Sequence, residues 1–174
     1  MDEDHILIKE FNDGNIESFN KLLIKYLGST YNFFLKITGD IMVSEDLTNE
    51  VFLILFKKLN KFRYEAKFST YLYRIKLNKA NSWIARDKWK KLLHLDQIKD
   101  PLISKLRIEK EYVKIELRRQ INKLPKKQRE IVFLRIYEQL SYKRIFELTG
   151  INENSAKVNY FYALKTLKRK MNYE

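Results

Sequence analysis

Apolar residues recur at intervals of three and four along nearly the whole chain, the spacing that places them on one face of an α-helix. Only four Gly and two Pro occur in 174 residues, so there is little material for the tight turns of a sheet. We therefore expect an all-α fold. In the first half the periodicity predicts helices at about 6–11, 16–37, 45–59 and 68–90.

The helical pattern is interrupted between residues 92 and 107, where Asp100-Pro101 breaks it and no clear apolar face exists. We interpret this stretch as a flexible linker between two small helical domains, residues 1–91 and 108–174. The C-terminal one is predicted to be a helix-turn-helix domain, for the reasons given below.

The chain carries a formal net charge of +13, distributed unevenly. Residues 1–56 have a net charge of −6, residues 57–91 of +10 and residues 92–174 of +9. This distribution predicts an anionic partner such as nucleic acid for the later segments, and a different contact surface for the first. The alternative is a lysine-rich composition with solvated faces.

Several classes of function are disfavoured by composition. The chain has no Cys, and His5 and His94 lie far apart, so we expect no metal and no cofactor. The longest unbroken apolar run covers only residues 51–56, which predicts no membrane insertion. The N-terminal residues are acidic where a signal peptide is basic, so a cytoplasmic protein is expected.

Turn and capping residues in the second domain follow the helix-turn-helix pattern. Pro125 stands at a predicted helix start, and that helix continues to about Tyr137. Ser141 is predicted to cap a short helix over 142–149. Gly150 occupies the position after it, where a left-handed residue ends a helix, and Asn152 caps the last helix.

The last helix combines an apolar inner stripe with a polar and basic outer face. Its outer residues belong to types that contact phosphates and base edges. They are Ser155, Lys157, Asn159, Phe161, Tyr162 and Lys165, with Val158 nearby. The pattern favours a DNA-reading helix over the alternative, an ordinary helical hairpin with a solvated face.

The predicted helix over 45–59 carries a second, outward face. Ser44 is expected to be its N-cap, which would place Glu45 and Asp46 in the first turn. Its residues are Asp46, Asn49, Glu50, Leu53 and Lys57, and Phe52 and Phe56 widen the apolar region of the helix. Such a face predicts a protein partner, although Phe52 and Phe56 are equally compatible with completing the core.

The loop over 60–67 and the following helix mix aromatic and basic residues. Cations that follow phosphates, together with rings that stack on unpaired bases, are typical of single-strand binding. The candidates are Arg63, Lys67, Tyr71, Lys76, Lys79, Trp83 and Arg86. Most aromatic residues at helical spacing are nevertheless core, and we expect this of Tyr73.

Three motifs together resemble the bacterial RNA polymerase sigma factors. The sequence SEDLTNEVF at 44–52 is similar to their Ala-Glu-Asp-Leu-x-Gln-Glu-Val-Phe stretch. FSTYLYRI at 68–75, followed by Asn78 and Arg86, resembles their Phe-x-Thr-Trp-Leu-x-x-Ile segment with its downstream Asn and Arg. Leu124-Pro125 with Arg129, and the residues around Ser141 and Lys157, resemble their C-terminal helix-turn-helix. Order and spacing match the extracytoplasmic-function (ECF) group of the sigma-70 family.

The resemblance implies a function without an active site of its own: directing core RNA polymerase to promoters and opening the strands. Asp46, Asn49, Glu50, Phe52 and Leu53 would dock on the clamp helices of the largest subunit. A minus-ten site would comprise Arg63, Lys67, Tyr71, Lys76, Asn78, Lys79, Trp83 and Arg86. The minus-thirty-five site would comprise Arg129, Ser155, Lys157, Asn159, Phe161, Tyr162 and Lys165. The polymerase flap, promoter DNA and an anti-sigma factor are the other implied partners.

Some residues depart from the family pattern: Tyr71 replaces the usual Trp, and Val158 and Tyr162 stand where Ser and Arg are common.

Two alternative functions follow from the residues. A conventional helix-turn-helix regulator would bind duplex operators without polymerase, but it leaves the face around Asp46 unexplained. A nuclease is disfavoured because no carboxylate cluster and no Gly-rich phosphate loop is evident.

Overall fold

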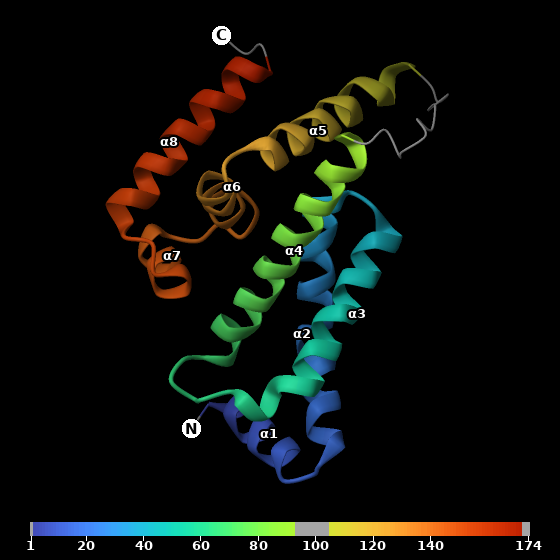
Figure 1. The fold of residues 1–174 in the computed structure, drawn as a ribbon, viewed down its shortest axis with the longest axis vertical. Helices are drawn as coiled ribbons and strands as arrows, with labels where there is room; N and C mark the ends of the chain where they lie inside the picture. Colours follow the sequence, from blue (N-terminus) through green and yellow to red (C-terminus); the bar gives the residue numbers. More distant parts are fainter. Residues whose placement is uncertain (1, 93–104, 172–174) are drawn as a thin grey trace. The chain divides into compact units, whose positions relative to one another are not determined.

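A computed structural model describes the backbone of residues 2–92 and 105–171 (Figure 1). Every regular element in this part of the chain is helical, as predicted. The chain divides into two compact units, Met1–Ala80 and Asn81–Glu174. The predicted linker at 92–107 lies almost entirely outside the described residues, and helix α5 already begins at Lys105. The domain limits at 91 and 108 therefore stay predictions.

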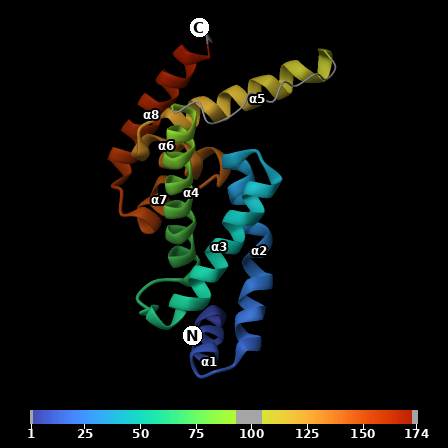
Figure 2. The same ribbon diagram turned by 45° about the vertical axis from the view of Figure 1, so that its right-hand side comes forward.

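The N-terminal unit contains three complete helices, a short 3-10 turn and the first half of a fourth helix. Helices α2 and α3 run side by side, and α1 packs against α2 and the 3-10 turn (Figures 1 and 2). The elements are α1 (Glu3–Asn12), α2 (Ile16–Thr38), α3 (Ile41–Lys58), η1 (Leu59–Lys61) and α4 (Phe68–Leu92).

Helix α3 begins earlier than the sequence predicted, and the assignment of Ser44 as its N-cap is wrong. The helix starts at Ile41, directly after Gly39, which is left-handed, and Asp40, which is extended. The Asp40 carboxylate accepts a hydrogen bond from the amide of Val43 at 3.0 Å and so fills the capping role. Ser44 is buried inside the helix, and its hydroxyl donates to the Asp40 carbonyl. Asp46 is consequently outside the first turn.

The core of this unit is made by large side chains that α2, α3 and α4 direct toward one another. Phe34, Leu55 and Phe68 are each at most 1% exposed. Burying each such side chain contributes about 1.5–3 kcal/mol to stability. These contacts set the position of α4, whose outer residues include the predicted single-strand site.

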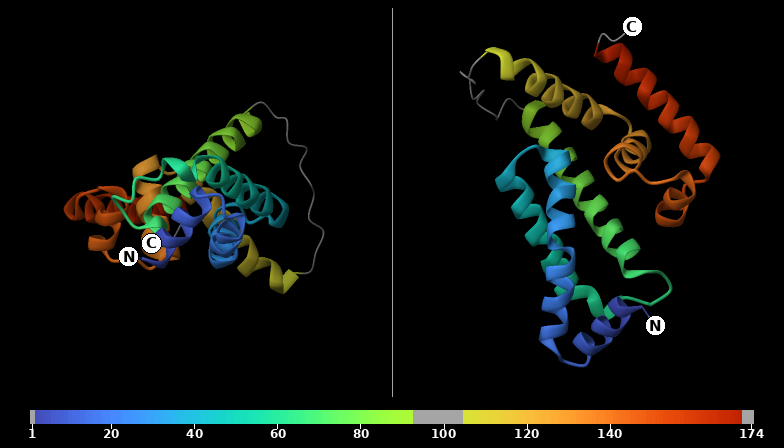
Figure 3. Two further views of the ribbon diagram at one scale, coloured as in Figure 1. Left: turned by 90° about the horizontal axis from the view of Figure 1, so that it is seen from below. Right: turned by 180° about the vertical axis from the view of Figure 1, so that it is seen from behind.

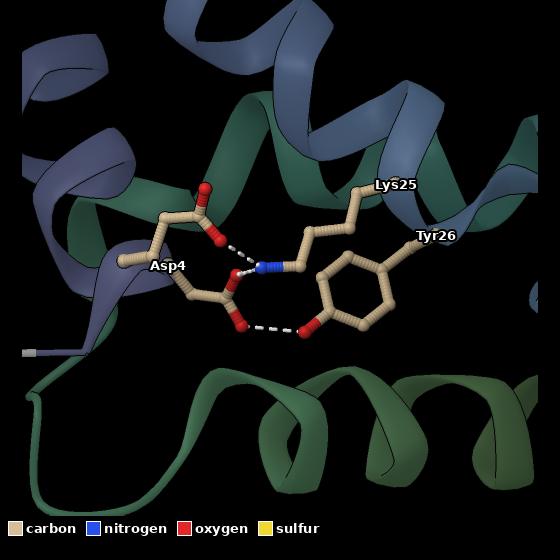
Figure 4. Close-up of polar contacts among 4 residues, drawn as sticks. Asp4, Lys25 and Tyr26 are labelled. Carbon is tan, nitrogen blue, oxygen red and sulfur yellow. Dashed lines mark hydrogen bonds and ion pairs between the residues drawn. The ribbon is translucent and has the colours of Figure 1, made fainter.

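A polar cluster fastens α1 onto α2 (Figure 4). The buried Asp4 carboxylate accepts hydrogen bonds from the Lys25 ammonium at 2.7 Å and from the Tyr26 hydroxyl at 2.5 Å. Lys25 also donates to Glu3 at 2.6 Å. Burial and the bond to Asp4 raise the pKa of Tyr26, and the bonds to Asp4 and Glu3 raise the pKa of Lys25. Both groups therefore keep their protons across the physiological range.

Replacing Tyr26 with Phe should lower the free energy of unfolding by about 1–3 kcal/mol, because the buried Asp4 carboxylate loses a donor. Tyr31→Phe is the matched control, because it removes a hydroxyl from another half-buried tyrosine of the same helix. Urea unfolding followed by circular dichroism measures both. Equal midpoints for the two variants would contradict the role given to Tyr26.

The C-terminal unit includes four α-helices and one π-helical turn. The predicted helix from Pro125 to Tyr137 is an α-helix whose last five residues widen into that π turn. The elements are α5 (Lys105–Lys123), α6 (Lys126–Val132), η2 (Phe133–Tyr137), α7 (Tyr142–Thr149) and α8 (Glu153–Lys170). Among the described residues, no helix is both long enough and apolar enough to cross a membrane.

Candidate nucleic-acid interface

Helices α7 and α8 have the N-caps that the sequence predicted. The Ser141 hydroxyl accepts from the amide of Arg144 at 3.2 Å, and the Asn152 side chain accepts from that of Asn154 at 2.9 Å. Gly150 is left-handed, with φ of 75°, and its amide closes α7 on the Phe146 carbonyl at 2.8 Å. The two helices follow each other through this short turn, visible in orange and red on the right of Figure 3.

Small residues bring α8 close to its neighbours α6 and α7. Ala156 and Ala163 are fully buried, and Leu167 is 5% exposed. The inner stripe predicted from the sequence comprises Ala156, Tyr160, Ala163, Leu164 and Leu167, and its other two members are half-buried. Because this stripe faces inward, the opposite side of α8 is directed to solvent.

Arg135, which sequence analysis did not single out, ties the turn before α7 to both α7 and α8. Its guanidinium donates to the Leu140 carbonyl at 2.5 Å. The same group lies 4.7 Å from the centre of the Tyr142 ring and 5.9 Å from that of Tyr160. Such cation–π contacts stabilise by about 0.5–2 kcal/mol. Nothing in the local pattern distinguishes Arg135 from other surface arginines, because its partners come from later elements.

The outer face of α8 exposes most of the residues predicted to meet the minus-thirty-five element. Ser155, Lys157 and Lys165 are exposed, and Phe161 and Tyr162 are 62% and 52% exposed. The Asn159 amide donates to the Ser155 carbonyl of its own helix at 2.8 Å. The Lys157 ammonium lies 5.8 Å from the centre of the Tyr142 ring.

Arg129 belongs to a different environment. It is buried, and its guanidinium donates to the carbonyls of Asn122 at 3.1 Å and Leu124 at 3.2 Å, at the end of α5. Burial lowers its pKa, although an arginine remains charged. These bonds hold the α5–α6 turn, and a DNA contact by Arg129 stays a prediction.

The loop before α4 is anchored by a group of rings. Phe62 is buried and lies 5.2 Å from Tyr71, measured between ring centres, and Tyr64 lies 5.0 Å from Phe62. His5 of α1 contacts both Phe62 and Tyr64 at 5.5 and 5.4 Å. Burial raises the pKa of Tyr71, which is half-buried. Part of the predicted stacking set therefore packs within the protein.

Two cations of the loop project to solvent. Arg63 and Lys67 are exposed on either side of Tyr64, which is left-handed with φ of 59°. Tyr64 is itself 42% exposed. The loop thus presents two positive charges and one accessible ring.

The predicted residues on α4 differ in accessibility. Lys76 is buried, with its ammonium 5.0 Å from the Phe33 ring centre and 5.7 Å from that of Tyr73. Tyr73 is buried, as expected. The remaining predicted residues are more accessible: Asn78 and Arg86 are exposed, and Lys79 and Trp83 are half-buried.

Helix α3 presents the predicted docking face, with one member turned inward. Asp46, Asn49 and Leu53 are exposed, and Leu53 is 57% accessible. Phe52 is buried, so in the free chain it has the core position that was left open as an alternative. Glu50 forms an ion pair with Lys79 of α4. Two residues predicted for different partners therefore contact each other.

Phe56 is 48% exposed and packs against Phe11 and Phe19 at 5.4 and 5.3 Å between ring centres. It covers the junction of α1, α2 and α3 while keeping an accessible edge.

Within the described parts of the chain, no group of three or more His, Cys, Asp or Glu is placed to hold a metal ion.

The C-terminal unit is a helix-turn-helix whose second helix is exposed and cationic. The N-terminal unit is helical and has an aromatic and basic surface. Together these features indicate a DNA-binding protein of transcription. Family comparison makes this specific. The description "Sigma-70 region 2" matches residues 22–90, and "Sigma-70, region 4" matches residues 114–167. Together they span more than two thirds of the chain. The chain belongs to the sigma-70 family of RNA polymerase sigma factors, in its ECF group, and directs RNA polymerase to promoters.

Similar proteins occur in several bacteria. The chain is 26% identical to RNA polymerase sigma-H factor of Pseudomonas aeruginosa over 160 residues, covering 83% of this chain and 81% of that protein. It is 24% identical to ECF RNA polymerase sigma factor SigW of Bacillus subtilis, covering 94% of each. It is also 24% identical to ECF RNA polymerase sigma-E factor of Escherichia coli, covering 97% and 94%.

Two solved structures share the fold. One is CnrH in complex with the cytosolic domain of CnrY, with a TM-score of 0.66, 20% identity and 99% of each chain covered. The other is the sigma factor RpoE of Bartonella quintana in complex with the anti-sigma factor NepR. Its TM-score is 0.58 at 16% identity, covering 91% of this chain and 99% of that one.

Gly150→Ala should lower the free energy of unfolding by about 1–2 kcal/mol, because a Cβ disfavours the left-handed conformation. No atom lies within 4 Å of the added Cβ, so the effect comes from the backbone alone. Gly28→Ala is the control: it lies inside α2, also with open space, and should stabilise by about 0.5–1 kcal/mol. Thermal unfolding of the two variants should shift in opposite directions. A shift of the same sign in both would contradict this account of the turn.

Proposed function

We propose that the sigma factor divides promoter recognition between its two units. In this proposal the outer face of α8 reads the minus-thirty-five element as duplex. The loop over 60–67 with the outer side of α4 binds the minus-ten element and favours its opening. The observation that carries the proposal is the exposure of Ser155, Lys157, Phe161 and Tyr162 on a correctly capped second helix.

Strand opening requires no chemistry from this chain. Bases that leave the stack lose pairing and stacking energy, which contacts to the protein offset. Arg63 and Lys67 are placed to bind the phosphates of a separated strand, and Tyr64 offers an accessible ring beside them. We propose that the chain contributes no catalytic step and acts in the cytoplasm, where RNA polymerase and promoter DNA are found.

Docking on polymerase is assigned to the outer face of α3. Asp46, Asn49 and Leu53 combine one charge, one amide and one exposed apolar side chain on a single helical sector. We propose the clamp helices of the largest subunit as their partner, and the flap as a partner of the C-terminal unit. An anti-sigma factor is a further proposed partner, because a protein of the same fold was solved with one.

The double substitution Asp46→Ala and Leu53→Ala should weaken association with core polymerase at least tenfold, because it removes the charge and the apolar anchor of this face. The double substitution Glu17→Ala and Ile24→Ala provides the control, since it removes one exposed acidic and one exposed apolar side chain from α2 instead. Fluorescence anisotropy of labelled chain titrated with core polymerase measures both. Unchanged affinity of the double variant, with unchanged helicity, would exclude this face.

Arg63→Ala should reduce open-complex formation more than initial promoter binding, because its charge is proposed to meet only the separated strand. Permanganate reactivity of minus-ten thymines measures opening, and footprinting of the closed complex at low temperature measures binding. Lys21→Ala, an exposed cation on α2 outside the proposed contact surfaces, is the control. Equal loss in both measurements would show that Arg63 contributes only general attraction to DNA.

A further inference from the structure

The side of α8 that faces away from its buried residues is apolar at its centre. Its buried residues Ala156 and Ala163 fix the inner direction of the helix, and Val158 lies nearly opposite to them. Val158 is 53% exposed, and Phe161 and Tyr162, one turn further on, are more than half exposed. The rings of Phe161 and Tyr162 pack edge to face at 5.6 Å. The three residues form one patch, here called the α8 apolar patch.

Cations surround this patch. Helix α8 contains Lys157, Lys165, Lys168, Arg169 and Lys170 against a single acidic residue, Glu153. Apolar side chains at the centre with positive charge at the rim match the major groove, whose floor carries bases and whose walls carry phosphates. The charge argues for DNA as the occupant of this face.

The side chains on this face limit which bases it recognises. Guanine is recognised by arginine or lysine side chains, but the only arginine of α8 is Arg169, at its last turn, and Lys157 and Lys165 lie beside the apolar patch rather than within it. The groups at the centre of the face donate or accept few hydrogen bonds. What an apolar side chain recognises in the major groove is the C5-methyl group of thymine.

We propose that the α8 apolar patch gives this sigma factor a preference for thymine-bearing, A·T-rich upstream elements, through contact of Val158, Phe161 and Tyr162 with thymine methyl groups. The inference rests on the proposed function, since it requires α8 to lie in the major groove. Lys157 and Lys165 then supply sequence-independent attraction to the flanking phosphates. Specificity and affinity are thus carried by different residues of one helix.

The test uses holoenzyme assembled from the full chain and core polymerase. Promoters are first selected from a library randomised in the upstream element, with transcript start sites as the readout. The selected elements should be A·T-rich and share thymines at fixed positions. Each shared thymine is then replaced by uracil, which lacks only the methyl group and keeps the same hydrogen-bonding edge.

Loss of a contacted methyl should weaken holoenzyme binding about fourfold for each position. Val158→Ser should abolish this difference between thymine and uracil at one position or more. Ile24→Ser, an exposed apolar residue on α2, should leave the difference unchanged and is the matched control. Because each result is a ratio between two DNAs, a general loss of activity in a variant does not affect it.

Distinct outcomes separate this inference from the proposed function. Promoter-directed initiation with G·C-rich upstream elements, or without sensitivity to uracil, would overturn the inference and leave the proposed function standing. Failure of the holoenzyme to initiate at any defined promoter would overturn both. If Phe161→Ala weakened binding to core polymerase without abolishing it, and left the selected elements and their sensitivity to uracil unchanged, the patch would be a protein contact, and the inference would be wrong.

Discussion

The left-handed turn at Gly150 is the constraint on which the helix-turn-helix unit depends. It ends α7 and directs α8 so that the alanines of α8 face the domain and its long side chains face outward. Packing alone would not select this direction, because a helix with small inner residues can lie against its neighbours in several orientations. The caps at Ser141 and Asn152 and the contacts of Arg135 then hold the arrangement.

The N-terminal unit depends on a core of large side chains rather than on a turn and its caps. Phe34, Leu55 and Phe68 are buried side chains of three different helices, and Phe68 of α4 packs against Tyr26 of α2 at 5.2 Å between ring centres. The ion pair between Glu50 and Lys79 crosses from α3 to α4. A substitution of Glu50 therefore also removes an ion-pair partner of Lys79, which belongs to the other proposed contact surface.

Short-range patterns were the reliable guide to secondary structure. The helix limits around Gly150 and the caps at Ser141 and Asn152 were predicted correctly, because each depends on residues within one turn. The start of α3 was not, because two candidate caps, Asp40 and Ser44, lie four residues apart. The Asp40 carboxylate follows the left-handed Gly39 and has the geometry to cap α3. The Ser44 side chain is buried in the interior instead.

The sequence by itself determined the all-α class, the two helical blocks, the helix-turn-helix and the family, since periodicity, caps and motif spacing are local properties of the chain. Only the tertiary structure showed which predicted surface residues are covered. Phe52 and Lys76 are buried although they were predicted as contact residues together with exposed neighbours, and the Lys76 ammonium lies over the Phe33 ring of α2. Burial depends on what packs against a face, and no pattern within that face contains this information.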